Sequence, residues 1–292
     1  MTGPNSLGFI GLGVMGSRMC ANLVRRSQRP VTVFDPVPGA LAQAVSVGAQ
    51  AADSVGAVAA AADVVFLSLP SIVQVESVCE QILAAPRRPS VVVDMSTSDV
   101  TRTRELAAFM SKEGVVLVDA PVARQRQAAE AGTLLITVGA DEETFTAIEP
   151  FLSCMGSDVV LAGGVGAGQV LKIMNNMVLF INMNALAEAL AIGRAAGVDP
   201  HTLFSTLSLG SADSFALRNT ATATMLPDEF PERAFPVDYA MKDLRLALQL
   251  AADSDIPVGS AQQTMDLLRR AHDAGLGSAY YPVMIKVIEG RA

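Results

Sequence analysis

The 292-residue sequence contains no tryptophan, and aromatic residues make up only 5% of it. Proteins that bind single-stranded nucleic acid stack the bases on aromatic side chains. The chain also lacks runs of lysine or arginine, and its formal net charge is −8. Because nucleic-acid binding depends on clustered positive charge, the sequence predicts no nucleic-acid partner.

Metal-ligating and disulfide-forming residues are equally scarce. Cys20, Cys79 and Cys154 are odd in number and widely separated, and no CxxC spacing occurs. Only His201 and His272 could add imidazole ligands. We therefore expect no metal site, and we expect buried free thiols in a reducing cytoplasm.

Membrane-targeting features are weak. The opening MTGPNSLGFIGLG has no basic region before its apolar stretch, so it does not resemble a signal peptide. The most apolar long segment, residues 170–193, contains Lys172, four asparagines and Glu188. These polar groups would be costly in lipid. The segment predicts a helix buried inside a cytoplasmic protein without membrane association.

Hydrophobic residues make up 51% of the chain and follow two different patterns along it. In the first 160 or so residues, short β-rich runs alternate with alanine-rich helical stretches. Most of the β-rich runs are continuously apolar, which is typical of strands buried on both faces of a parallel sheet. The last two are candidates for a mixed or antiparallel extension. The predicted strands are residues 7–10, 31–34, 63–69, 90–96, 115–121, 134–140 and 158–163.

The hydrophobic pattern changes at the glycine-rich segment AGGVGAGQ. Beyond it no convincing strand is found, and residues 167–196 predict one long helix followed by shorter, proline-punctuated helices. The sequence therefore predicts an α/β fold class, with a Rossmann-type doubly wound sheet over residues 1–164 and an all-α domain over residues 165–292.

A G-x-G-x-x-G motif lies between the first predicted strand and a helical pattern. Gly11 would permit the tight turn, Gly13 the close approach of a pyrophosphate, and Gly16 the packing of helix on strand. The helix N-terminus would then present free N–H groups to the phosphates. The predicted phosphate-binding residues are Gly11, Leu12, Gly13, Val14, Met15 and Gly16.

The end of the second predicted strand carries Asp35, 19 residues after Gly16. A carboxylate at this place accepts hydrogen bonds from the ribose hydroxyls of NAD and repels the 2′-phosphate of NADP. The neighbouring FDPVPG offers no lysine or arginine. We therefore predict NAD as the cofactor and NADP as the less favoured one.

Two further turns follow the third and fourth long predicted strands, at the sheet edge where ligands of such folds bind. They supply Leu69 and Pro70 as candidates for the cofactor groove, and Ser96 and Thr97 for its nicotinamide half. An ordinary role as strand-end caps explains these residues equally well.

The long predicted helix carries Lys172, Asn175 and Asn176 at i, i+3 and i+4, a spacing that places them on one face. Their neighbours are apolar, so these polar groups need partners. A lysine can take the hydroxyl proton when an alcohol loses a hydride, provided that burial or a nearby cation lowers its pKa. Lys242 is a candidate for that cation, although a surface lysine paired with Asp238 or Asp243 fits the residues slightly better.

Together these motifs resemble the β-hydroxyacid dehydrogenase family, which includes 3-hydroxyisobutyrate dehydrogenases. The resemblance covers essentially the whole chain and implies a Rossmann domain and an all-α domain joined by a long helix, in a homodimer or homotetramer. It implies Lys172 as the catalytic acid/base, Asn176 as a substrate-binding residue, and Lys242 close to both nicotinamide and substrate. The matching segments are residues 8–16, 94–98, 119–134, 166–176 and 242–248.

One segment departs from the family pattern. After DAPV the family has Ser-Gly-Gly, whose hydroxyl and amides hold the substrate carboxylate, whereas this chain has Ala123, Arg124 and Gln125. Arginine is suited to bidentate binding of carboxylate, sulfonate or phosphonate, and the arrangement is similar to that of sulfolactaldehyde reductases. We predict that Arg124 and the amides near Ala123 hold a small anionic substrate, while Arg126 faces solvent or another subunit.

The predicted function is NAD-dependent interconversion of a short 3-hydroxy acid and its semialdehyde. The alternatives are NADH-dependent reduction of another anionic semialdehyde, such as sulfolactaldehyde or succinic semialdehyde, and a non-catalytic NAD-binding regulator. Imine reductases share the implied fold but usually lack a lysine at the position of Lys172. The related 6-phosphogluconate dehydrogenases are longer than this chain.

Overall fold

The computed structural model describes residues 4–232 and 234–292, and the chain divides into two compact units. The N-terminal unit is Met1–Lys172 and the C-terminal unit is Ile173–Ala292. The division falls inside the longest helix, α8 (Ala167–Ala195), a few residues beyond the boundary expected at 164.

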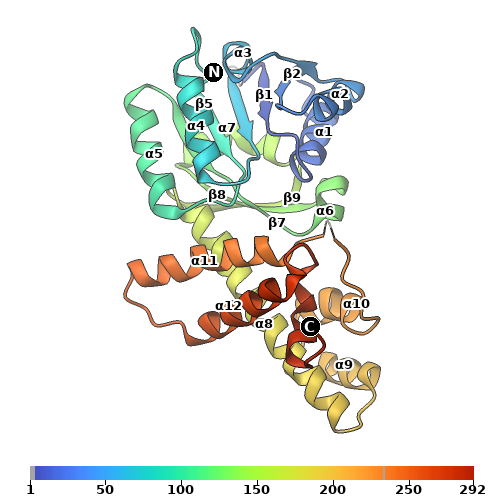
Figure 1. Cartoon of the computed structure of the whole chain (residues 1–292). Helices are drawn as coiled ribbons and strands as arrows, with labels where there is room; N and C mark the ends of the chain where they lie inside the picture. Colours follow the sequence, from blue (N-terminus) through green and yellow to red (C-terminus); the bar gives the residue numbers. More distant parts are fainter. Residues whose placement is uncertain (1–3, 233) are drawn as a thin grey trace. The chain divides into compact units, whose positions relative to one another are not determined.

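The N-terminal unit contains a nine-stranded sheet in the order β3-β2-β1-β4-β5-β6-β8-β7, with β9 also paired to β8 (Figure 1). Its strands from β1 to β6 run parallel, β8 is antiparallel to β6 and β7, and β9 is parallel to β8. The seven predicted strands are confirmed, and the expected extension is a mixed one, since β8 is antiparallel to β6 whereas β9 is parallel to β8. The strands are β1 (Leu7–Ile10), β2 (Val31–Phe34), β3 (Gln50–Ala51), β4 (Val64–Leu67), β5 (Val91–Asp94), β6 (Val116–Asp119), β7 (Val122–Ala123), β8 (Leu134–Gly139) and β9 (Gly156–Gly163).

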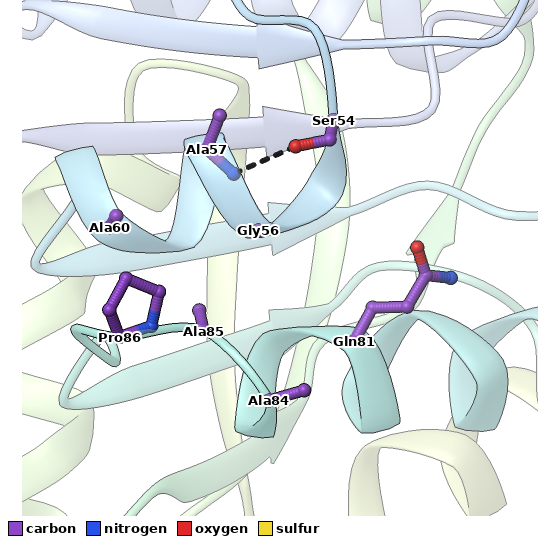
Figure 2. Close-up of a pocket in the computed structure, with 8 residues that line it drawn as sticks. All are labelled: Ser54, Gly56, Ala57, Ala60, Gln81, Ala84, Ala85 and Pro86. Carbon is purple, nitrogen blue, oxygen red and sulfur yellow. Dashed lines mark hydrogen bonds between the residues drawn. The ribbon is translucent and has the colours of Figure 1, made fainter.

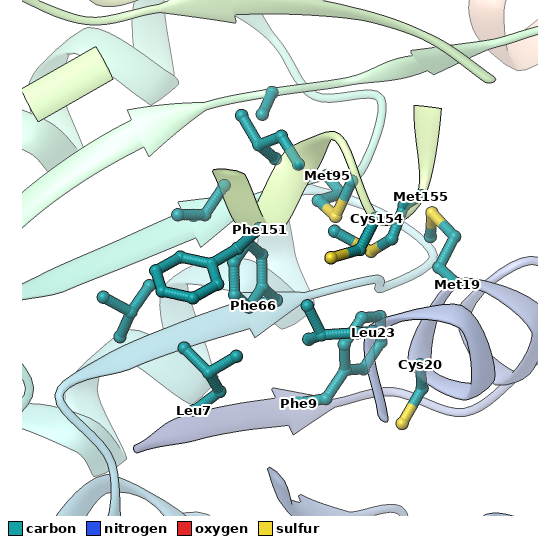
Figure 3. Close-up of a cluster of buried hydrophobic side chains, with 14 of the residues drawn as sticks. Leu7, Phe9, Met19, Cys20, Leu23, Phe66, Met95, Phe151, Cys154 and Met155 are labelled. Carbon is teal, nitrogen blue, oxygen red and sulfur yellow. The ribbon is translucent and has the colours of Figure 1, made fainter. Parts of the chain in front are cut away.

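Helices cover both faces of this sheet, which explains why its strands are continuously apolar. On one face, α1 and α7 bury side chains such as Met19 and Phe151 against Phe9 and Phe66 of β1 and β4 (Figure 3). On the other face, α3, α4 and α5 pack against the alternate strand residues, such as Ile10. The helices of this unit are α1 (Gly16–Arg26), α2 (Pro38–Ser46), α3 (Val55–Ala61), α4 (Ile72–Leu83), α5 (Val100–Lys112), α6 (Arg126–Ala131) and α7 (Glu142–Leu152).

All three cysteines are free and buried, as expected. Burial raises the pKa of the Cys20 thiol to about 12. A thiol that stays protonated is a poor nucleophile, so these cysteines are core residues.

The strand order reverses beside β1, whose neighbours are β2 and β4. Ile10 is paired with Phe34 on one side and Leu67 on the other, so the three strands end at the same level. Ligands of open parallel sheets bind at such a reversal, outside the carboxyl ends of the strands.

The C-terminal unit is helical, and its described residues include only one isolated bridge, between Pro236 and Tyr280. By length and composition α8 is apolar enough to cross a membrane, but its Phe180 is fully buried and contacts the rings of Phe235 and Tyr281. The side of α8 that carries Phe180 therefore packs into the core of this unit. The other elements are α9 (Pro200–Leu209), the π-helical η1 (Ala216–Ala221), α10 (Thr222–Thr224), α11 (Val237–Asp253), α12 (Gly259–Ala271), the π-helical η2 (His272–Leu276), the 3-10 helix η3 (Tyr281–Val283) and α13 (Met284–Ile288).

Candidate functional site

The three glycines of the loop after β1 differ in whether their surroundings leave room for a side chain. Gly11 has φ +93°, and a Cβ on it would collide with the carbonyl oxygen of Ser68. A Cβ on Gly16 would collide with the carbonyl oxygen of Gly11. A Cβ on Gly13 would meet no atom within 4 Å. The packing of the chain therefore requires the first and third glycines, whereas the second leaves open space for a group from outside.

The helix that follows this loop begins without a side-chain cap. Met15 stands at the N-cap of α1, and the first turn carries no acidic residue. By contrast, α3 and α4 are capped by Ser54 and Ser71. The N–H groups of Ser17 and Arg18 donate to the carbonyl oxygens of Gly13 and Met15, so no side chain occupies this helix end. Its positive dipole end suits a pyrophosphate, and the residues present fit a dinucleotide.

Asp35 lies just beyond β2 and is buried, with 8% of its surface exposed. Its Oδ2 accepts a hydrogen bond from the N–H of Leu12 at 2.6 Å, and its Oδ1 accepts one from the N–H of Val37 at 2.8 Å. The carboxylate thus holds the glycine loop in place. A carboxylate can accept about four hydrogen bonds, so it retains acceptor capacity for ribose hydroxyls.

The predicted residues beyond β4 and β5 are joined directly. The Oγ atom of Ser96 accepts a hydrogen bond from the N–H of Leu69 at 2.9 Å. Pro70 and Thr97 are the chain neighbours of these two residues. All predicted cofactor residues of this unit therefore lie at the ends of four strands that are adjacent in the sheet, β2, β1, β4 and β5. Their contact with a cofactor stays a prediction.

Two buried carboxylates at the same edge were not predicted as site residues. Asp94, at the end of β5, accepts hydrogen bonds from the N–H of Ser96 at 2.9 Å and from Oγ of Ser98 at 3.0 Å. Burial raises the pKa of Asp94 to about 6. The available signal was a lone aspartate closing an apolar run, in VVVD and again in VLVD.

The second of these carboxylates, Asp119, binds the start of α8. Its two oxygens accept hydrogen bonds from the N–H groups of Gly166 at 2.6 Å and Gln169 at 2.8 Å. Burial raises the pKa of Asp119, and these two N–H groups oppose the shift. A Cβ on Gly168 would lie 2.8 Å from Oδ2 of Asp119, so the helix start packs tightly on the strand end.

Lys172 lies one turn further along α8 and is buried, with 9% of its surface exposed. Gln169, three residues earlier, is completely buried and bonds the backbone of Ser96 and Ser98. Within the N-terminal unit, the predicted acid/base thus lies on a helix that is attached to the predicted nicotinamide edge.

Asn176 and Lys242 meet at a buried carboxylate of the C-terminal unit, that of Asp243. Nδ2 of Asn176 donates to Oδ2 of Asp243 at 2.7 Å, and the ammonium group of Lys242 lies 3.2 Å from Oδ1 of the same carboxylate. Asn175 donates its Nδ2 hydrogen to Oδ1 of Asn176 at 3.1 Å. Asp243 therefore fixes which way the Asn176 amide is turned. Lys242 thus pairs with Asp243, whereas Asp238, its other candidate partner, contacts His272.

Arg124 is held by neighbours on the strands beside it. Its guanidinium donates to the carbonyl oxygen of Thr133 at 2.7 Å and to Oγ of Ser157 at 2.9 Å, and it lies 2.7 Å from Oδ2 of Asp158. Hydrogen bonds from Ser157 and Arg124 lower the pKa of Asp158. Substrate binding by Arg124 stays a prediction, and it requires exchange of these partners.

The backbone at this point is unusual for an arginine. Arg124 has φ +77°, a conformation that favours glycine, and glycine is the residue in the family pattern. Ala123 precedes it as a buried residue of β7, and Arg126 begins α6 with an exposed side chain.

Two surface hollows lie away from these residues. One, of about 450 Å³, lies between α3 and the end of α4, and alanines form half of its lining (Figure 2). The other, of about 350 Å³, lies among Arg194, Asp228, Glu289 and Arg291, which form ion pairs with one another. Neither contains a predicted site residue.

The comparisons with known proteins agree over both units. The family model described as the NAD binding domain of 6-phosphogluconate dehydrogenase matches residues 6–164. The model described as the NAD-binding region of NADP-dependent 3-hydroxyisobutyrate dehydrogenase matches residues 166–288.

Individual relatives match along almost their whole length. 2-(Hydroxymethyl)glutarate dehydrogenase of Eubacterium barkeri is 37% identical over 97% of this chain and 94% of its own. 3-Hydroxyisobutyrate dehydrogenase of Pseudomonas aeruginosa is 36% identical over 92% of this chain and 93% of its own. The structure of Mycobacterium tuberculosis 3-hydroxyisobutyrate dehydrogenase with L-serine has a TM-score of 0.90 at 30% identity, and 99% of each chain is covered.

Replacing Gly13 with alanine tests the phosphate loop. The added methyl group meets no protein atom, so we expect an unchanged melting temperature and a dissociation constant for NAD raised at least about 10-fold, or ~1.4 kcal/mol. The constant is measured by calorimetry. Gly39→Ala is the matched control, because its Cβ also meets open space. Equal NAD affinity in the parent and Gly13→Ala would contradict a pyrophosphate at this loop.

The raised pKa of Asp94 predicts a pH effect on stability. Asp94 in the folded state keeps its proton up to about pH 6, whereas the unfolded chain releases it near pH 4. Its contribution to stability is therefore present below pH 4 and lost as the pH rises through 6, by up to about 3 kcal/mol. In urea unfolding, the parent should lose stability relative to Asp94→Asn between pH 4 and 7. Asp141→Asn is the control, because Asp141 is an exposed helix cap whose pKa is lowered, and relative to this variant the parent should gain stability as the pH rises. If the stabilities of the parent and Asp94→Asn change with pH in parallel, the pKa of Asp94 is not raised by burial.

Proposed function

Since the chain belongs to the β-hydroxyacid dehydrogenase family, we propose that it interconverts a short 3-hydroxy acid of the 3-hydroxyisobutyrate type and its semialdehyde. The relatives are dehydrogenases and reductases, and this chain is an NAD(P)-dependent oxidoreductase of the same kind. The observation that carries the proposal is a buried lysine, Lys172, on a helix that starts at the same sheet edge as the dinucleotide loop.

Each side chain has one proposed role in the reaction. The nicotinamide supplies hydride chemistry when it is bound. Lys172 takes the proton of the substrate hydroxyl during oxidation and returns it during reduction. Asn176 binds the substrate through its amide, in the orientation set by Asp243, and Lys242 adds positive charge beside the anion.

NAD is the proposed cofactor in preference to NADP. The support is the carboxylate of Asp35, which already binds the glycine loop through Leu12. A second negative group, the 2′-phosphate, would be repelled at this place.

The substrate is a small anion, and two chemical classes fit it. L-Serine, named with the Mycobacterium tuberculosis relative, carries a carboxylate and a 3-hydroxyl group, as 3-hydroxyisobutyrate does. Arg124 favours the second class, a sulfonated or dicarboxylic semialdehyde, because a guanidinium binds sulfonate and carboxylate in a bidentate way.

We also propose a homodimer or homotetramer located in the cytoplasm. The support for assembly is two exposed apolar side chains on α8 within the C-terminal unit, since Val178 is 52% exposed and Ile192 is 69% exposed. The mass in solution decides between these states and a monomer.

An absorbance assay of NADH formation and loss tests the reaction. The panel contains 3-hydroxyisobutyrate, 3-hydroxypropionate, serine, 4-hydroxybutyrate, sulfolactaldehyde and succinic semialdehyde, each with both nicotinamides. We expect turnover of at least one, with higher kcat/KM for NAD(H). Lys172→Ala should lower kcat about 10²–10⁴-fold without changing NAD affinity, whereas Lys112→Ala, on the exposed end of α5, should change nothing. Tight NAD binding without turnover would instead identify a regulator.

Paired variants test the role of Arg124. Arg124→Gly relieves the positive φ and removes the guanidinium, so KM for an anionic substrate should rise about 10-fold or more, as expected for a lost charged hydrogen bond. Asp158→Asn weakens the competing ion pair and should lower KM. Arg126→Ala is the control, since that side chain is exposed on α6. If KM is the same in all four proteins, Arg124 does not bind the substrate.

A further inference from the structure

Gln169 makes a two-point contact with one short turn. Its Oε1 accepts a hydrogen bond from the N–H of Ser98 at 3.0 Å, and its Nε2 donates to the carbonyl oxygen of Ser96 at 2.8 Å. The two bonds bracket Thr97, which is predicted to face the nicotinamide. Because both ends of the amide are used, the contact fixes the turn in position and in rotation.

The backbone of the same residue is bound to a different strand. The N–H of Gln169 donates to Oδ2 of Asp119 at 2.8 Å. Oγ1 of Thr137, on β8, donates to the carbonyl oxygen of Gly168 at 3.0 Å. The first turn of α8 is therefore attached to the carboxyl ends of β5 and β6 and to β8 at once, and Gln169 makes the attachment to the β5 turn.

Lys172 follows three residues later on the same helix face. The rise between the two residues is about 4.5 Å, and the hydrogen bonds of the helix make this spacing rigid. Any shift of the Gln169 contact therefore changes the distance between the lysine and the Ser96–Ser98 turn.

We propose that Gln169 is a positioning residue for the reaction. It sets the distance between the ammonium group of Lys172 and the cofactor-facing turn at Thr97. The inference rests on the proposed function, since it matters only where Lys172 exchanges a proton with a substrate beside the nicotinamide. A misplacement of about 1 Å can lower a rate about 100-fold, so a residue that touches neither substrate nor cofactor can still control kcat.

Two substitutions distinguish a positioning role of Gln169 from a role in folding alone. Gln169→Leu removes both bonds at every pH. Gln169→Glu keeps the shape, and its carboxyl group can donate to Ser96 only while it is protonated. Burial raises the pKa of a carboxyl group, so protonation is within reach of the assay.

The charged groups around this position are the same in the parent and both variants. They are Asp94 from β5, Asp119 from β6, Arg104 from α5 and Lys172 on α8 itself. For Gln169→Leu, which adds no charge, their titration cancels when kcat of the variant is divided by kcat of the parent at the same pH. In Gln169→Glu an ionised carboxylate raises the pKa of a nearby ammonium group, and this effect makes the kcat ratio rise with pH, which is opposite to the rescue by protonation.

The experiment measures kcat, KM and NAD affinity from pH 5.5 to 9 for the parent, both variants and Gln81→Leu, an exposed glutamine on α4. We expect Gln169→Leu to lower kcat about 10–100-fold, with NAD affinity within about 3-fold of the parent. For Gln169→Glu the kcat ratio should rise as the pH falls, and for Gln169→Leu it should stay flat. Gln81→Leu should match the parent.

The failures are distinguishable. A parent that turns over no substrate overturns the proposed function and this inference with it. An active parent with a Gln169→Leu variant of equal kcat overturns only the positioning role. A loss of kcat with the same pH dependence in both Gln169 variants also overturns it, because a role in folding alone gives no rescue by protonation.

Discussion

The carboxylate of Asp119 is the point at which the sheet and the long helix are joined. A buried carboxylate is costly unless N–H groups surround it, and here the start of α8 supplies two of them. The positive end of the helix dipole favours the same arrangement. Gly139 and Gly168 leave room for it, since a Cβ on either would contact the carboxylate. The location of Lys172 along α8 follows from where this helix begins.

At the glycine loop, packing within the chain explains two of the three glycines but not the third. A residue whose neighbours forbid a side chain is explained by packing, as Gly11 and Gly16 are. Gly13 has no such neighbours, so the structure alone would tolerate alanine there. The proposed approach of a dinucleotide to the backbone would account for this glycine, which lies where the strand order reverses.

The sequence predicted whatever depends on local pattern. Continuous apolar runs located all seven long strands, whereas β3 and β7 have two residues each and show no periodicity. Contacts between distant residues were not predictable. Gln169 and Ser96 are 73 residues apart, and Asn176 and Asp243 are 67 apart. A glutamine in a glycine-rich junction gives no sign of its partner, because the partner is chosen by the fold.

Arg124 has a backbone conformation that favours glycine, and its contacts in the structure do not explain why an arginine stands there. A non-glycine residue in the left-handed region costs about 1–2 kcal/mol, and glycine would avoid this cost. The ion pair with Asp158 lies at the surface, where water and salt weaken it. Stability alone therefore favours glycine at this position. The proposed role of Arg124 in binding the substrate anion would account for an arginine at this position, and the ion pair with Asp158 would have to break when that anion binds.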